Sequence, residues 1–159
     1  MVDVGLVLRM IGIGLGRPLV RWGVPLLAKR LYPDAQVCKD LRIRWRRGLP
    51  PPFSLMATFG IPQLTIALEI ESVSLYTNIL VSRAVVSIGG VVEVELVHDE
   101  TIPRGKTKLI HKTSAITVEQ GTYLKSSKLH DLKVTTTLVV GRRRLTKEEQ
   151  LSGEINVAP

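Results

Sequence analysis

The stretch Leu64-Thr65-Ile66-Ala67-Leu68-Glu69-Ile70-Glu71 decides the fold, because aliphatic residues alternate with other residues along its whole length. Successive side chains of a strand point to opposite faces, so this order directs four aliphatic side chains into a core and both glutamates toward water. Burying these four side chains contributes about 6–12 kcal/mol before chain entropy is subtracted. A shift of one residue would bury the glutamates, and the register is therefore well determined.

Short segments of the same kind recur from Phe53 to the end of the chain. Gly89-Gly90 fits a hairpin turn, and the Pro103–Gly105 spacing fits a second turn. Thr117 and Gln120 have the spacing of a capping box, which predicts a short helix through about Lys125. We therefore expect a mainly β protein, an antiparallel seven-stranded β-sandwich with one short helix. The expected strands cover residues 64–71, 79–88, 92–96, 108–116, 132–140 and 151–157, and residues 53–59 form either a strand or a short helix.

The organisation predicted along the 159 residues has three parts. Residues 1–31 form an amphipathic helical segment, residues 32–52 a basic strand with a Pro-rich linker, and residues 53–159 the β-sandwich domain. The length allows one domain with a core of its own. Cys38 is the only cysteine, so an intramolecular disulfide is impossible. The low number of Asn and Gln residues leans toward a thermophile.

The net charge of +8 is placed unevenly. Residues 1–50 carry ten basic and three acidic side chains, a balance of +7, whereas the remainder is close to neutral. This asymmetry indicates an anionic partner, either lipid head groups or nucleic acid.

Residues 4–28 are strongly apolar but are interrupted by arginines. The longest uncharged runs are far shorter than the roughly 18–20 residues that a spanning helix needs. On a helical projection Arg9, Arg17 and Arg21 share one sector, which is typical of a helix lying in the membrane interface. Packing of the same apolar face on protein, and a true membrane span, are the alternatives.

Residues 41–47 alternate apolar side chains with arginine and so predict a strand with a basic outer face. This face suits lipid head groups, and its arginines with Trp45 would also suit single-stranded nucleic acid. The residues expected to contact a membrane surface or another anion are Arg9, Arg17, Arg21, Trp22, Lys29, Arg30, Arg42, Arg44, Trp45, Arg46 and Arg47.

No motif for catalysis or for a cofactor is evident. His98, His111 and His130 are the only histidines, and none has another His or Cys at ligand spacing. The segment Gly12–Gly16 lacks the preceding strand and the spacing of a phosphate-binding loop. We expect no enzymatic activity, no metal and no cofactor.

The body of the chain resembles the late embryogenesis abundant type 2 domain, also called the water-stress and hypersensitive-response domain. The resemblance rests on residues 64–72, which look like the central strand of that family, and on residues 101–107, which look like its I-P-x-G turn. Residues 79–96 are similar to its hairpin, and the likeness spans roughly residues 60–140. Ser72-Val73-Ser74 stands where the family usually has Asn-Pro-Asn.

The resemblance implies a seven-stranded sandwich with one helix, often tethered to a membrane, with lipid or interaction roles and no catalytic residues. We therefore expect a membrane-associated protein at the cytoplasmic face that binds lipid or a protein partner, with stress response as the family's setting. The protein partner could also be a second copy of the same chain, which would give a homo-oligomer. The alternatives are a small accessory subunit of a larger complex and a single-stranded nucleic-acid-binding module that uses residues 42–47.

Overall fold

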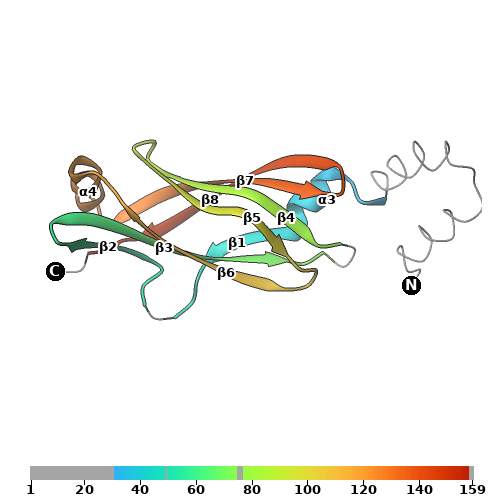
Figure 1. The fold of residues 1–159 in the computed structure, drawn as a ribbon, viewed down its shortest axis with the longest axis horizontal. Helices are drawn as coiled ribbons and strands as arrows, with labels where there is room; N and C mark the ends of the chain where they lie inside the picture. Colours follow the sequence, from blue (N-terminus) through green and yellow to red (C-terminus); the bar gives the residue numbers. More distant parts are fainter. Residues whose placement is uncertain (1–30, 49, 75–76, 158–159) are drawn as a thin grey trace, which may run out of the picture.

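The computed structural model describes residues 31–48, 50–74 and 77–157. Within these ranges the chain is mainly β, with two sheets and the helices α3 and α4 (Figure 1). The amphipathic segment predicted for residues 1–31 lies outside the described residues except for Leu31. The elements are α3 (Asp34–Asp40), β1 (Leu41–Trp45), β2 (Phe53–Thr58), β3 (Ile61–Ser72), β4 (Ile79–Ile88), β5 (Val92–Ile102), β6 (Thr107–Ala115), α4 (Val118–Lys125), β7 (Leu129–Val140), β8 (Arg143–Glu154) and β9 (Asn156–Val157).

The first sheet is built on β3, the strand that contains the alternating stretch. Strands β1 and β2 pair one after the other along one edge of β3, and β6 pairs along its opposite edge. All three pairings are antiparallel, whereas the two-residue strand β9 runs parallel to β2. Leu64, Ile66, Leu68 and Ile70 are all at most 1% exposed, as the alternation predicts.

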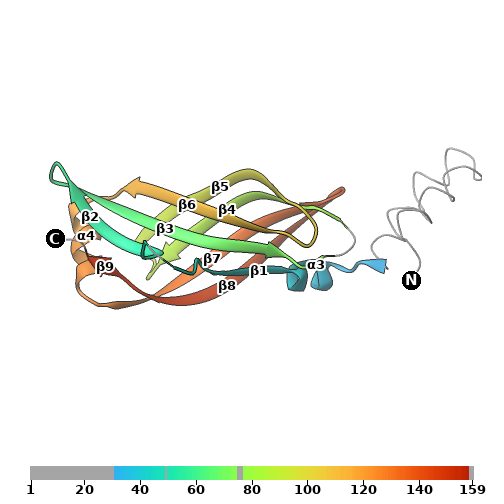
Figure 2. The ribbon, with the colours of Figure 1, turned by 90° about the horizontal axis from the view of Figure 1, so that it is seen from below.

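The second sheet has four antiparallel strands in the order β5, β4, β7, β8. One apolar cluster contains buried side chains from both sheets, so the two sheets pack over a shared core. Figures 1 and 2 show an elongated body with strands running along its length. This arrangement is consistent with a β-sandwich.

Three features differ from the sequence-based strand assignment. Strand β1, placed in the linker by the sequence, pairs with β3 and so belongs to the first sheet. Strand β8 begins at Arg143 rather than near Leu151, although its first half is highly charged. Residues 156–157 leave the second sheet and join the first as β9. The described residues therefore form nine strands, and one pair is parallel.

Helix α3 and strand β8 are joined by contacts between residues that are far apart in the sequence. Arg143 Nη1 donates hydrogen bonds to the Tyr32 carbonyl oxygen at 2.7 Å and to Asp34 Oδ1 at 2.8 Å. Lys147 Nζ donates to the Leu41 carbonyl oxygen. These cations satisfy backbone and carboxylate oxygens at the start of the described chain, which explains how a charged segment can be a regular strand.

Within the described ranges, no helix is both long enough and apolar enough to cross a bilayer.

Candidate binding pocket and basic strand

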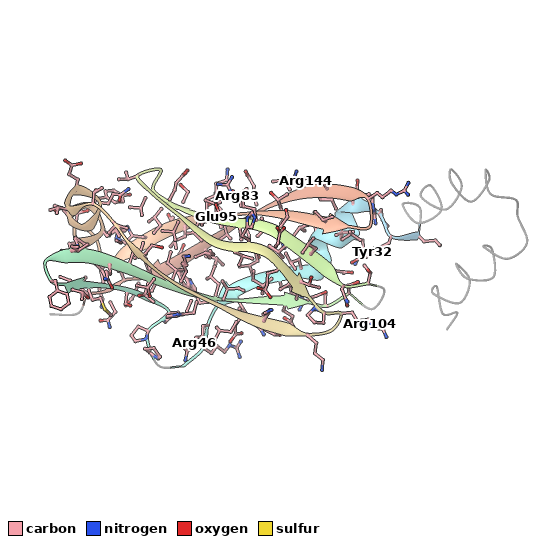
Figure 3. All side chains as sticks on the ribbon, viewed as in Figure 1. Tyr32, Arg46, Arg83, Glu95, Arg104 and Arg144 are labelled. Carbon is pink, nitrogen blue, oxygen red and sulfur yellow. The ribbon has the colours of Figure 1, made fainter. Side chains whose placement is uncertain are left out.

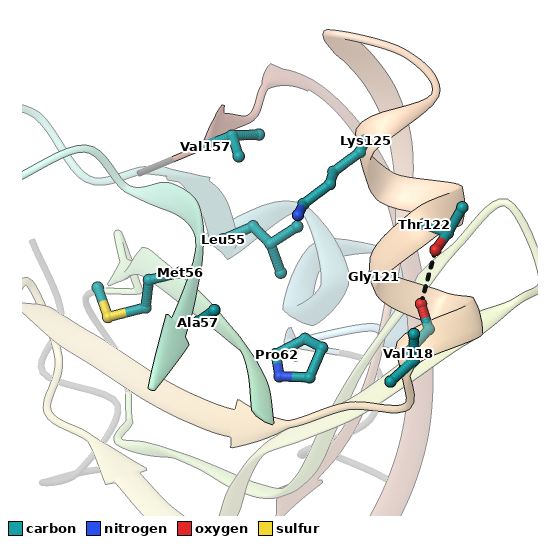
Figure 4. A pocket seen from close by; sticks show the side chains of 9 residues that line it. All are labelled: Leu55, Met56, Ala57, Pro62, Val118, Gly121, Thr122, Lys125 and Val157. Carbon is teal, nitrogen blue, oxygen red and sulfur yellow. Dashed lines mark hydrogen bonds between the residues drawn. The ribbon is translucent and has the colours of Figure 1, made fainter. Parts of the chain in front are cut away.

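An open apolar pocket of about 320 Å³ lies at the end of the body where α4 sits (Figure 4). Strand β2 and helix α4 form its two sides, and residues of β3 and β9 complete it. Its volume is at the lower end of the range of about 300–1,000 Å³ typical of small-molecule sites. The lining residues are Leu55, Met56, Ala57, Pro62, Val118, Gly121, Thr122, Lys125 and Val157.

The capping box predicted from the sequence fixes the start of α4 beside this pocket. Thr117 Oγ1 accepts from the Gln120 backbone nitrogen, and Gln120 Oε1 accepts from the Thr117 backbone nitrogen. One turn later, a Cβ on Gly121 would lie 3.2 Å from the Pro62 Cβ. The glycine therefore lets α4 approach the start of β3 closely, and this approach shapes one wall of the pocket.

Lys125 is the one charged residue among those that line the pocket. It lies in the last turn of α4, and its side chain extends toward Leu55 and the pocket interior (Figure 4). Within the described part of the chain, Lys125 takes part in no ion pair. An ammonium group beside an apolar wall suits a ligand that has an aliphatic part and an anionic group.

The described residues that line the pocket include no carboxylate, imidazole or thiol, so this site offers binding chemistry rather than acid–base chemistry. His130 lies nearby but is buried, and its Nε2 is 2.9 Å from the Leu124 carbonyl oxygen. Its ring packs edge-on against Phe53 at 6.1 Å between centroids. No group of three or more His, Cys, Asp or Glu within the described ranges could hold a metal ion.

Arg44, on the basic strand β1, is bound within the protein. Its Nε lies 2.9 Å from Glu69 Oε2, and its Nη1 lies 3.4 Å from Glu71 Oε2. Both glutamates lie opposite β1 on β3, so the register of the sheet creates these ion pairs. The hydrogen bond from Arg44 lowers the pKa of the Glu69 carboxyl. Arg44 thus serves the sheet, and its charge is largely balanced.

The Trp45 ring is also used inside the fold. It stacks on Phe53 with 5.6 Å between ring centroids, and its Nε1 donates to the Ser152 carbonyl oxygen at 2.9 Å. A Cβ on Gly153 would lie 2.5 Å from Trp45 Cζ2, so the indole packs directly on the backbone of β8. A ring held this way has little free face on which a nucleobase could stack.

Some of the other predicted contact residues lie among the described residues, and the rest lie outside them. Arg42 and Arg47 are exposed, whereas Arg46 is half-buried and has an interaction partner. Arg46 directly follows the last residue of β1, and Figure 3 shows it far from α4. Arg9, Arg17, Arg21, Trp22, Lys29 and Arg30 lie outside the described residues.

Sequence reasoning did not find the pocket. Its residues come from segments around 55, 62, 118–125 and 157, and none of these segments carries a motif of its own. The capping box predicted helix α4 on one side of the pocket. Nothing in the sequence indicated that strand β2 forms the opposite side.

Fold and pocket together define a mainly β protein of two sheets with an apolar pocket at one end. No protein-family description and no curated protein matches the sequence. Among solved structures, the chain is similar to the X-ray structure of the Northeast Structural Genomics Consortium target SoR45, with 6% identity and a TM-score of 0.46 over 73% of this chain and 87% of that one. It is also similar to the crystal structure of a protein from Archaeoglobus fulgidus, with 10% identity and a TM-score of 0.42 over 72% of this chain and 92% of that one.

Proposed function

We propose that this protein is a non-enzymatic β-sandwich, attached to the cytoplasmic face of a membrane, whose end pocket binds the aliphatic part of a lipid. The observation that carries the proposal is the apolar pocket with Lys125 at its side. The resemblance of residues 60–140 to the late embryogenesis abundant type 2 domain agrees with a lipid-binding role, and it is part of the proposal.

The energetics favour an aliphatic ligand of moderate length. Each buried methylene contributes about 0.8 kcal/mol, so a segment of about eight carbons gains about 6 kcal/mol. This gain exceeds the lower end of the cost of association, about 4 kcal/mol. An anionic head group near Lys125 would add a smaller amount, because the ammonium group is exposed.

Attachment to the membrane is assigned to the N-terminal segment. Its apolar face would enter the interface while Arg9, Arg17 and Arg21 reach lipid phosphates. A single amphipathic segment gives reversible binding that strengthens with anionic lipid, so this part of the proposal predicts a dependence on both lipid charge and salt.

A titration of the full chain with a fluorescent fatty acid tests the pocket. We expect saturable binding, and we expect Lys125→Gln to weaken it about twofold to fivefold because one exposed charge pair is lost. Lys128→Gln is the matched control, since Lys128 lies in the same region but pairs with Glu154 at 3.3 Å. Absence of binding, or equal effects of both substitutions, would refute the proposed ligand site.

Flotation with vesicles tests the attachment. The double variant Arg17→Glu with Arg21→Glu should lose flotation with anionic vesicles. The control, Arg142→Glu with Arg144→Glu, makes the same change in net charge at exposed positions of the folded body and should float like the original protein. Flotation of both variants to the same extent would show that the N-terminal arginines are not the attachment.

The nucleic-acid alternative has less support. Arg44 is paired with two glutamates and Trp45 is stacked on Phe53, so two of the side chains that this reading needs are occupied within the fold.

A further inference from the structure

Exposed apolar side chains gather at the pocket end of the body. Among the described residues, nine large hydrophobic side chains are exposed. All but Leu31 and Leu109 lie on α4 or on strands and turns at the same end of the body. We define the apolar rim as Phe59 and Ile61 at the β2–β3 turn, Val91 at the β4–β5 turn, and Val118 at the start of α4. The Gln120 side chain donates to the Val91 carbonyl oxygen at 3.1 Å, which brings two of these elements together.

Phe59 occupies a turn position that is unfavourable for a bulky residue. Thr58 pairs with Ile61, so Phe59 and Gly60 form a two-residue hairpin turn, and their φ angles are 50° and 78°. Turns with two positive φ angles favour Asn or Asp before Gly, because aromatic residues rarely adopt this conformation. The side chain of Phe59 is completely exposed, so packing in the core does not compensate for the backbone conformation. An observed outlier of this kind points to a function for the side chain.

The rim is continuous with the pocket. Val118 belongs to both, Met56 and Val157 are exposed at the pocket itself, and helix α4 carries the exposed Glu119 in its first turn and the exposed Lys125 in its last. Apolar side chains that project from turns complement a surface with an apolar interior, and Lys125 lies on the pocket side, where it can meet an anionic head group. This combination of shape and charge favours a lipid bilayer over a flat protein surface.

We propose that the apolar rim inserts into the interface of a lipid bilayer, so that the pocket opens against the lipid from which its ligand comes. Helix α3, where the described chain begins, lies at the other end of the long axis (Figures 1 and 2). The rim is thus a lipid contact distinct from the N-terminal segment. The idea that the pocket takes its ligand from the bilayer rests on the proposed function. The insertion of Phe59 and Ile61 into the bilayer does not depend on it.

The test places an environment-sensitive dye at the rim of the full chain. Cys38→Ser removes the one native cysteine. Ile61→Cys then carries a nitrobenzoxadiazole label at the rim, and Leu109→Cys carries it near the start of β6 as the control. The two positions are matched, because Ile61 is 53% exposed and Leu109 is 50% exposed. The vesicles contain equal parts of phosphatidylcholine and phosphatidylglycerol.

Insertion predicts that the emission of the label at position 61 brightens and shifts to the blue with vesicles, whereas the label at 109 stays unchanged. Adding Phe59→Asn should reduce the change at 61 severalfold, and this substitution suits the turn, so unfolding would not explain the loss. The proposal is overturned if position 61 does not respond, if 109 responds equally, or if Phe59→Asn has no effect.

Self-association through the rim would also overturn the proposal, and the same label detects it. A second copy covering the rim would change the signal at 61 with rising protein concentration in the absence of vesicles. Flotation and fatty-acid binding are measured separately, so a failure of the N-terminal attachment or of the pocket is distinguishable from a failure of the rim.

Discussion

Phe59 combines an unfavourable backbone conformation with a side chain that contributes almost nothing to the folded state. A non-glycine residue with a left-handed backbone costs about 1–2 kcal/mol, and Asn tolerates this conformation better than most residues do. Because the ring is completely exposed, the fold gains almost nothing from it. Packing within the described chain therefore does not explain why a phenylalanine occupies this position.

Phe59→Asn should stabilise the protein by about 0.5–1 kcal/mol, because the turn becomes one that Asn-Gly sequences favour. The midpoint of thermal unfolding should rise by about 1–4 °C in a chain of this size. A calorimetric scan measures the shift, and Leu109→Asn on β6 provides the control for removing an exposed apolar side chain. A fall in the midpoint for Phe59→Asn would contradict the account of the turn.

Gly153 makes room for the Trp45 ring, and the reason is steric rather than conformational. A Cβ at this position would lie 2.5 Å from Cζ2 and 2.9 Å from Cε2 of the rigid indole. The ring itself is held by Phe53 and by the Ser152 carbonyl oxygen, so it cannot move away freely.

Gly153→Ala should destabilise the fold by about 1–3 kcal/mol, the usual cost of overpacking. Denaturant unfolding followed by tryptophan fluorescence measures this loss. Ser152→Ala is the neighbouring control, because it keeps the carbonyl that accepts from Trp45. If both variants unfold at the same denaturant concentration, the close packing of Trp45 on β8 is not important for stability.

At the scale of elements, a small polar cluster joins the last residue of α3 to Gln36 within the helix and to Tyr32 just before it. Tyr32 Oη donates to Asp40 Oδ2 at 2.7 Å, and Gln36 Nε2 donates to Asp40 Oδ1 at 2.6 Å. Burial of the phenol raises the pKa of Tyr32 to about 12 from its ordinary value of 10.0. The folded state therefore favours the neutral phenol.

The sign of this shift predicts an alkaline loss of stability. The contribution of Tyr32 is fully present below pH 10.0 and is lost as the pH rises toward about 12. Ultraviolet absorbance of tyrosinate should show a late phase from the Tyr32 phenol, and Tyr32→Phe should remove that phase. Tyr123→Phe is the control. A late phase that persists in Tyr32→Phe would refute the assignment.

Elements that depend on local signals could be predicted from the sequence. The alternation around Leu68 predicted the central strand, Gly89-Gly90 predicted the turn between β4 and β5, and Thr117 predicted the start of α4. Strand β8 was partly missed, because Arg143 and Lys147 interrupt its apolar pattern. Their partners lie more than a hundred residues away, and no local pattern reveals them.

The same distinction explains the candidate sites. The basic strand was visible as a run of arginines, but the sequence did not show that Arg44 pairs with Glu69 on a neighbouring strand. The pocket was invisible, because it exists only once β2, α4 and β9 meet. A site assembled from distant single residues leaves no periodicity in the chain.

At the scale of the whole molecule, the described chain is an elongated body with different chemistry at its two ends. Helix α3, the first element of the described chain, lies at one end of the body, and residues 1–50 of the sequence hold most of the net positive charge. The α4 end carries the pocket and most of the exposed apolar side chains. The proposed membrane attachment and the proposed ligand binding can be tested with separate substitutions in one full-length protein.

Filling the pocket is the most direct test that it binds an aliphatic ligand. Ala57 lines the pocket on β2, and a tryptophan there suits a strand while occupying the space of the ligand. Leu109→Trp is the control, because Leu109 is exposed on strand β6 and does not line the pocket. The measurement is a titration of each full-length protein with a fluorescent fatty acid. We expect Ala57→Trp to weaken binding at least about tenfold, a loss equal to that of about two buried methylenes, with binding by Leu109→Trp unchanged. Equal binding by both variants and the original protein would contradict the assignment of this pocket as the lipid site.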